Sequence, residues 1–170
     1  LVWLMNLARA VARHSPALKS SLPPVFADIV EGDPNDPAKW VATATSNLPA
    51  LASYLDGVER QLASEKRTIV VAYDYLDRIG VLSERNVRES FTGSLLAMWA
   101  SFSGRYRHLR AKVFVREDLF EASTRAFPDA SKLESRSVSL SWSRESLYRV
   151  LIRQIASQSE PLRDWLKPAI

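Results

Sequence analysis

The stretch from Thr68 to Gly80, TIVVAYDYLDRIG, decides the fold. An apolar run, residues 69–73, leads directly into two aspartates, Asp74 and Asp77. A continuous apolar run of this length is typical of a strand that is covered on both faces in a parallel sheet. The polar residues that follow would then lie at the carboxyl end of the strand, where open α/β sheets bind their ligands.

Two later segments repeat this pattern of an apolar strand followed by a helix. Residues 111–115 form a second apolar run, which ends in Arg116, and residues 138–142 form a third run that alternates more. Helical periodicity follows each run, and Ser83 and Ser143 are candidate caps of two of the helices. Strand–helix repeats predict parallel strands joined by crossover helices. We therefore expect an α/β fold with parallel strands near 68–73, 111–115 and 138–142.

The first third of the chain is expected to be mainly helical. Apolar residues within 4–11 mark one helix face, and a long helical region covers about 38–64 with a break at Asn47-Leu48-Pro49. Four prolines and a glycine within residues 20–39 predict a loop. A last short helix is expected after Pro161. No linker is evident, so we expect a single domain or fragment, with residues 1–66 helical and 67–170 forming the α/β part.

Composition narrows the class of protein. The chain of 170 residues has no cysteine, which excludes disulfides and thiolate metal sites and fits a reducing compartment. No segment reaches the roughly 18 consecutive apolar residues that a membrane span needs. The net charge is +4, but the basic residues are dispersed, which favours a mildly basic surface over a nucleic-acid face. The nearest approach to a basic patch is residues 105–112.

An aspartate at the mouth of a strand buried on both faces would lose hydration unless a cation compensates it. A magnesium ion bound to nucleotide phosphates is such a cation, because magnesium usually takes one or two carboxylates and keeps several waters. Asp74 is placed for this role. The alternative is that Asp74 or Asp77 simply caps the turn that follows the strand. The residues alone leave both interpretations open.

Three stretches together resemble the P-loop NTPases of the KAP type and the related STAND type. IVVAYDYLDR, residues 69–78, resembles their Walker B region, in which an apolar run precedes an aspartate and then Leu-Asp-Arg or Leu-Asp-Glu. AKVFVREDLFE, residues 111–121, resembles their fourth core strand, which ends in a polar sensor residue. SLSWSRESLYRVLIRQI, residues 139–155, resembles the strand and helix that follow. The likeness implies a partial three-layer P-loop NTPase-like core.

The resemblance also implies roles for individual residues. Asp74 would bind magnesium and through it the nucleotide cofactor, ATP, while Asp77 would assist with water or metal. Arg116 would sense the γ-phosphate or pair with one of these aspartates. The alternative for Arg116 is a structural ion pair with a neighbouring carboxylate. Tyr75 stands where many relatives have a second acid that orients the attacking water.

The Walker A motif, G-x-x-x-x-G-K-[ST], is absent from this sequence. In the resembled family the P-loop strand lies between the fourth and fifth core strands, so the strands near 111–115 and 138–142 should flank a gap. We therefore expect this chain alone to be inactive and to bind neither ATP nor Mg²⁺ tightly. The intact parent would be a cytoplasmic ATPase or nucleotide switch that contacts nucleotide through the missing P-loop segment.

Two other function classes remain open. One is a non-catalytic α/β interaction module with a degenerate nucleotide site, which would bind a protein partner or itself; the missing P-loop and Tyr75 favour it. The other is a nucleic-acid-binding domain that uses the Arg105–Lys112 region, whose affinity for DNA or RNA would fall with salt.

Overall fold

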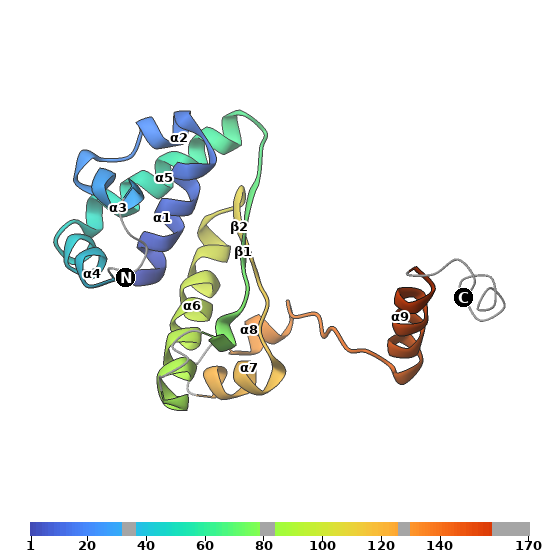
Figure 1. The fold of residues 1–170 in the computed structure, drawn as a ribbon. Coiled ribbons are helices and arrows are strands. Elements are labelled where there is room, and N and C mark those ends of the chain that lie inside the picture. The colour runs from blue at the N-terminus through green and yellow to red at the C-terminus, as the bar shows by residue number, and fades with distance from the viewer. Residues whose placement is uncertain (32–36, 79–83, 126–129, 158–170) are drawn as a thin grey trace. The chain divides into compact units, whose positions relative to one another are not determined.

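The apolar runs near 68–73 and 111–115 form a parallel pair of strands, as their sequence predicts. The computed structural model describes residues 1–31, 37–78, 84–125 and 130–157. In it, β1 (Ile69–Tyr73) pairs in parallel with β2 (Leu109–Val113), with Ile69 opposite Leu109 and Tyr73 opposite Val113 (Figure 1). Helix α6 (Arg85–Arg105) provides the crossover between them. The second strand begins at Leu109 rather than at Ala111.

Helices make up most of the described chain. The other α-helices are α1 (Val2–His14), α2 (Pro16–Ser20), α3 (Ala27–Glu31), α4 (Pro37–Ser46), α5 (Leu48–Ser64), α7 (Glu117–Thr124), α8 (Ala130–Glu134) and α9 (Arg144–Ser157), and two short 3₁₀ helices are η1 (Pro24–Phe26) and η2 (Leu76–Arg78). The predicted helical N-terminal third and its break at Asn47 are confirmed. Pro49 lies in the first turn of α5, where no intrahelical N–H bond is required.

Some local expectations fail or fall outside the described residues. Residues 20–39 were expected as loop, yet they contain η1, α3 and the first turn of α4. Ser83, the expected cap of the helix that begins at Arg85, and the helix expected after Pro161 both lie outside the described residues.

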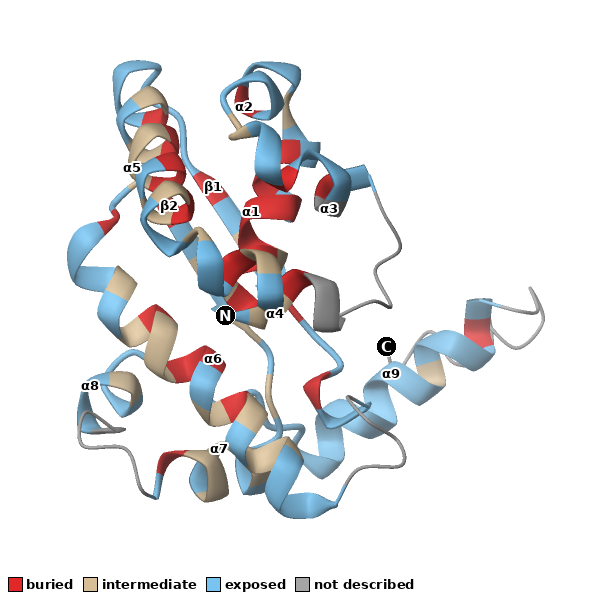
Figure 2. Ribbon diagram, turned by 90° about the vertical axis from the view of Figure 1, so that its left-hand side faces the viewer, coloured by how far each residue is buried: buried red, intermediate tan, exposed pale blue. Residues whose placement is uncertain are grey.

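The chain divides into two units, Leu1–Arg136 and Ser137–Ile170. The hydrophobic core belongs to the first unit, where α1 and α5 supply its centre and β1, β2 and α6 complete it (Figure 2). Its fully buried side chains include Met5, Leu7, Val11, Leu51, Leu55, Val58, Leu62, Leu95 and Leu109. In the part of the chain that the structure describes, no helix is long and apolar enough to cross a membrane.

The sheet is covered on one face only, which corrects the prediction of a strand buried on both faces. In β1 the side chains of Ile69 and Tyr73 are buried, whereas Val70 is 49% exposed and Ala72 is exposed. The matching outward positions of β2 are basic. A half-covered strand normally alternates apolar and polar residues. Here valine and alanine occupy the outward positions of β1, so the continuous apolar run overstates the burial.

The third expected strand, near 138–142, is not formed. These residues are extended without a ladder partner, and Val138, Leu140 and Trp142 are 81%, 78% and 63% exposed. Alternating apolar residues favour a strand, but a strand also needs a neighbouring backbone to bond with. Ser143 does cap the following helix α9, because its Oγ accepts a hydrogen bond from the backbone N–H of Ser146 at 3.1 Å.

The fold class is therefore correct only at the coarse level. The described residues show a mainly helical α/β fold with a two-stranded parallel sheet. The partial three-layer P-loop core with three parallel strands, which the resemblance implies, is not what these residues show. The second unit consists of the extended segment and α9, whose side chains are mostly exposed apart from the buried Ala156.

Candidate functional site at the carboxyl edge of the sheet

The residues that follow the two strands emerge at the same edge of the sheet, because β1 and β2 are parallel and in register. Helix η2 follows β1 there, and α7 follows β2, while the N-terminal part of α6 lies beside both (Figure 1). A cleft of about 140 Å³ opens between these elements. Its charged lining consists of Arg85, Arg88, Arg116, Asp77, Glu89 and Asp118.

The structure brings two of the three sequence-predicted site residues, Asp77 and Arg116, to this cleft. Asp74, the predicted metal ligand, is not part of its lining. Its Oδ1 instead accepts a hydrogen bond from the backbone N–H of Tyr75 at 2.7 Å. The alternative role of Asp74 as the cap of its own turn is therefore present in the structure.

The turn after β1 has an unusual backbone. Tyr75 adopts φ of 57°, in the left-handed region that residues with a side chain seldom enter. Its ring is 61% exposed, and the guanidinium of Arg78 lies 4.8 Å from the ring centre. Such strained, exposed residues cluster at ligand sites, where surrounding contacts hold them. Asp74 is itself exposed, so the loss of hydration expected for a buried strand mouth does not occur.

Arg116 forms the structural ion pair that was its alternative role. Its Nε and Nη2 donate to the two carboxylate oxygens of Asp118 at 3.1 and 3.0 Å. These hydrogen bonds from Arg116 hold the pKa of the Asp118 carboxyl below its usual value. Both side chains are mostly exposed, at 67% and 61%. Exposed pairs contribute little to stability, so Arg116 can exchange Asp118 for a ligand at small cost.

Two arginines of this cleft, Arg85 and Arg88, were missed by the sequence analysis. Arg85 bonds to Glu89 one helical turn later, with Nε to Oε1 at 2.6 Å. Arg88 is half-buried and makes no ion pair or hydrogen bond through its side chain with a residue that the structure describes. The signal was available: two arginines at i and i+3 share a face at the start of the helix that follows the key strand.

Whether these residues could hold magnesium depends on the carboxylate oxygens that they offer as ligands. Within the described ranges, no group of three or more His, Cys, Asp or Glu side chains is arranged to hold a metal ion. Magnesium bound to nucleotide does not need such a group, because one or two carboxylates join waters and phosphates around it. Asp74, with one carboxylate oxygen outside its turn bond, and Asp77 fit that limited role; they do not form an all-protein metal site.

The basic stretch at 105–112 is largely tied to its own surroundings. Arg105 forms an ion pair with Asp56, and the hydroxyl of Tyr106 donates to the same carboxylate at 3.0 Å. The Nε of Arg110 donates to the backbone carbonyl of Arg107 at 2.7 Å. These contacts fix the entry to β2. The ion pair with Asp56 compensates the charge of Arg105, whereas Arg110 bonds to a neutral carbonyl and keeps its charge.

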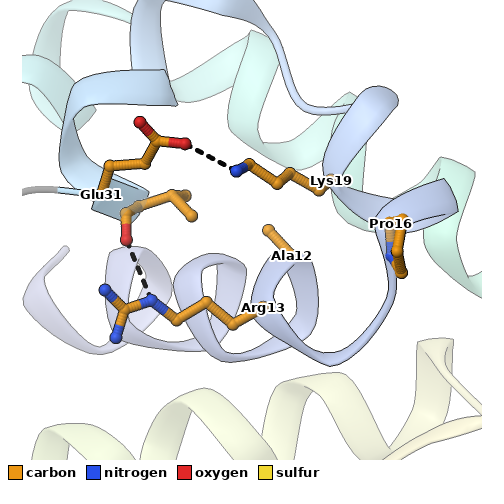
Figure 3. Close-up of a pocket in the computed structure, with 6 residues that line it drawn as sticks. Ala12, Arg13, Pro16, Lys19 and Glu31 are labelled. Atoms are coloured by element: carbon orange, nitrogen blue, oxygen red, sulfur yellow. Dashed lines mark hydrogen bonds and ion pairs between the residues drawn. The ribbon is translucent and has the colours of Figure 1, made fainter.

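A larger hollow of about 580 Å³ lies between α1, α2 and α3 (Figure 3). Its two cations are already engaged: Lys19 bonds to Glu31 at 2.6 Å, and the Nε of Arg13 donates to the carbonyl of Val30 at 3.0 Å. The hydrogen bond from Lys19 lowers the pKa of Glu31. No ligand is assigned to this hollow.

Comparison with known proteins adds no relative: no family model matches the chain, and neither a curated protein nor a solved structure matches it. The functional inference therefore rests on the residues and geometry of the carboxyl edge.

Proposed function

We propose that this chain is the later portion of a P-loop NTPase core, from a parent that acts as an ATPase or nucleotide switch. One observation carries the proposal. Asp77 and Arg116 follow two adjacent parallel strands and line one cleft at the carboxyl edge of the sheet. Ligands of open α/β sheets bind at this edge. The Walker B-like sequence of β1 and the sensor-like end of β2 agree with that placement.

The roles of the residues follow from their contacts. Magnesium, when bound with nucleotide, would neutralise charge that develops on the phosphates. The Asp74 oxygen that does not bond to the Tyr75 N–H is available for that ion. Asp77 would assist with water or metal in the cleft, and Arg116 would exchange its exposed partner Asp118 for a phosphate oxygen. The missing P-loop supplies the phosphate cradle, so the chain alone is expected to be inactive.

The test uses the intact parent with its P-loop. Asp74→Asn should abolish magnesium-dependent ATP hydrolysis while circular dichroism shows an unchanged fold. Asp28→Asn, which alters an exposed aspartate of α3, is the matched control and should hydrolyse ATP at the parental rate. A fully active Asp74→Asn protein, or a parent gene without any glycine-rich loop that ends in Lys-Ser or Lys-Thr, contradicts the proposal.

A non-catalytic interaction module is the second candidate, and one observation favours it. Large apolar side chains are exposed along the second unit, including Trp142, and in α9 Leu147 and Leu151 at 52% and 54%. Exposed apolar patches mark interaction surfaces. Under this alternative, sedimentation should show self-association without nucleotide that Trp142→Ser weakens. A monomer at all concentrations, with or without the substitution, removes self-association as the function.

A further inference from the structure

The charged lining of the cleft at the carboxyl edge separates into neutralised pairs and two remaining charges. Arg85 is paired with Glu89, and Arg116 is paired with Asp118. Asp77 and Arg88 remain, and neither makes an ion pair with a residue that the structure describes. They line the same cleft, yet they do not bond to each other. The cleft therefore presents one uncompensated negative charge and one uncompensated positive charge.

The position of Arg88 makes it an anion-binding side chain. It lies in the first turn of α6, a turn that contains no acidic residue and also carries Arg85. Cations at a helix N-terminus oppose the positive end of the helix dipole. Arg88 is half-buried as a residue and lines the cleft. An anion in the cleft would relieve its opposition to the helix dipole, and a guanidinium matches the oxygens of a phosphate group.

A ligand that carries both signs of charge fits this arrangement best. A bare phosphate would satisfy Arg88 but would be repelled by Asp77. A polyphosphate with a bound divalent cation satisfies both, since the cation faces the carboxylate and the phosphate oxygens face the guanidinium. We propose that Arg88 binds a phosphate group of a magnesium–polyphosphate ligand while Asp77 faces its cation. This inference rests on the proposed function and adds to it a phosphate contact from α6.

The probe is inorganic triphosphate with Mg²⁺, titrated into the full chain and followed by amide chemical shifts. Saturable shifts should appear near Asp77, Arg88 and Arg116, with a dissociation constant in the millimolar range because no P-loop contributes. Arg88→Ala should weaken binding about tenfold, which is the size expected for a lost charge-assisted contact, and Arg88→Lys should weaken it less. Arg60→Ala, at an exposed arginine of α5, is the control and should bind as the parent does.

Several outcomes would overturn the inference. They are the absence of saturable shifts, equal binding by Arg88→Ala, and equal binding when Mg²⁺ is chelated. The amide spectrum of each variant without ligand verifies that it is folded. Failure of the proposed function is a separate result: triphosphate binding at Arg88, together with a parent whose hydrolysis does not depend on Asp74, would retain the phosphate site and reject the NTPase assignment.

Discussion

The carboxylate of Glu59 accepts hydrogen bonds from the backbone N–H of His108 through both of its oxygens, at 3.0 and 3.1 Å. The same carboxylate accepts from the backbone N–H groups of Arg107 at 2.8 Å and Leu109 at 2.9 Å. Successive N–H groups that converge on one anion form a backbone nest. A single side chain of α5 thus fixes the start of β2. Because Arg116 follows the other end of this strand, its position also depends on Glu59.

Replacement of Glu59 should destabilise the first unit more than an exposed glutamate would. Glu59→Ala leaves the half-buried N–H groups of His108 and Leu109 without their acceptor, and we expect a loss of about 1–3 kcal/mol in the free energy of unfolding. Glu59→Gln keeps one acceptor oxygen and should lose less. Urea melts measure both, with Glu121→Ala, an exposed change on α7, as the control. A Glu59→Ala protein as stable as this control would show that water replaces the carboxylate.

The close approach of α6 and α7 depends on Gly93. A Cβ added there would lie 3.0 Å from the backbone carbonyl oxygen of Ser123, which cannot rotate away as a side chain can. We expect Gly93→Ala to lose about 1–3 kcal/mol through this overpacking. Gly57→Ala, in α5 with no atom within 4 Å of the new Cβ, should instead gain about 0.5–1 kcal/mol. If both substitutions raise the free energy of unfolding equally in parallel urea melts, α7 must shift to make room for the new Cβ at position 93.

How far the sequence predicted the fold can be judged from the strands. The apolar runs correctly predicted β1 and β2 and their parallel order, because the periodicity of α6 between them requires a crossover. The run could not show that Val70 and Ala72 face outward, since small or branched apolar residues occur on exposed as well as buried faces. Segment 138–142 was predicted as a strand from alternation, which carries no information about whether a partner strand is present.

The candidate site was predicted in the same partial way. The order of motifs pointed to the carboxyl edge, where Asp77 and Arg116 share a cleft, and their function there stays a prediction. The hydrogen bonds that Arg116 donates to Asp118 and the left-handed turn at Tyr75 depend on local geometry that no spacing rule gives. Arg88 was missed because an arginine in a helix is most often solvated. In the structure Arg85 pairs with Glu89 and Arg116 pairs with Asp118, so Arg88 has no ion-pair partner among the described residues.

Tyr73 should make the stability depend on alkaline pH. Burial raises the pKa of its hydroxyl to about 12, against a smaller opposing effect of the Trp99 N–H, although neither of these buried atoms reaches hydrogen-bond geometry. Between pH 10 and 12 the folded state keeps this proton while the unfolded state releases it. Stability is therefore complete below about pH 10 and falls as pH rises towards 12, by about 1.4 kcal/mol for each unit of pKa difference.

Tyr73→Phe should reduce the decrease in the free energy of unfolding between pH 10 and 12. It also removes a buried hydroxyl without a partner, so at neutral pH the stability should be unchanged or slightly higher. Urea melts at neutral pH and at several pH values from 10 upward measure both effects. Tyr148→Phe, at an exposed tyrosine, is the control and should follow the parent. The same pH slope for parent and Tyr73→Phe would contradict the assignment to Tyr73, and burial of Tyr54 and Tyr106, whose pKa values are also raised to about 12, would then account for it.

Removal of the second unit should leave the first unit folded. Every buried residue of the main hydrophobic cluster lies before Arg136, and the side chains of 138–142 and most of α9 are exposed, with Ala156 a buried exception. A chain that ends at Arg136 should therefore change its thermal midpoint by less than about 3 °C, which corresponds to roughly 1 kcal/mol for a domain of this size. Circular dichroism melts measure this shift. A larger decrease would show that the exposed apolar side chains cover the first unit in solution.

Asp74→Asn distinguishes a carboxylate kept for a ligand from one kept for the fold. The asparagine retains an oxygen that can accept the N–H of Tyr75, and Asp74 is exposed, so the free energy of unfolding should change by less than about 0.5 kcal/mol. Asp74→Ala removes that acceptor from a turn whose tyrosine has φ of 57°, and it should lose about 0.5–2 kcal/mol, as lost caps do. Urea melts at neutral pH without nucleotide compare the two. If asparagine is as stable as aspartate, the turn needs the oxygen but not the charge, and the charge of Asp74 stays available for the metal-binding role proposed above. A loss above about 1 kcal/mol for Asp74→Asn would instead make the charge structural and remove the physical basis for a metal-binding role.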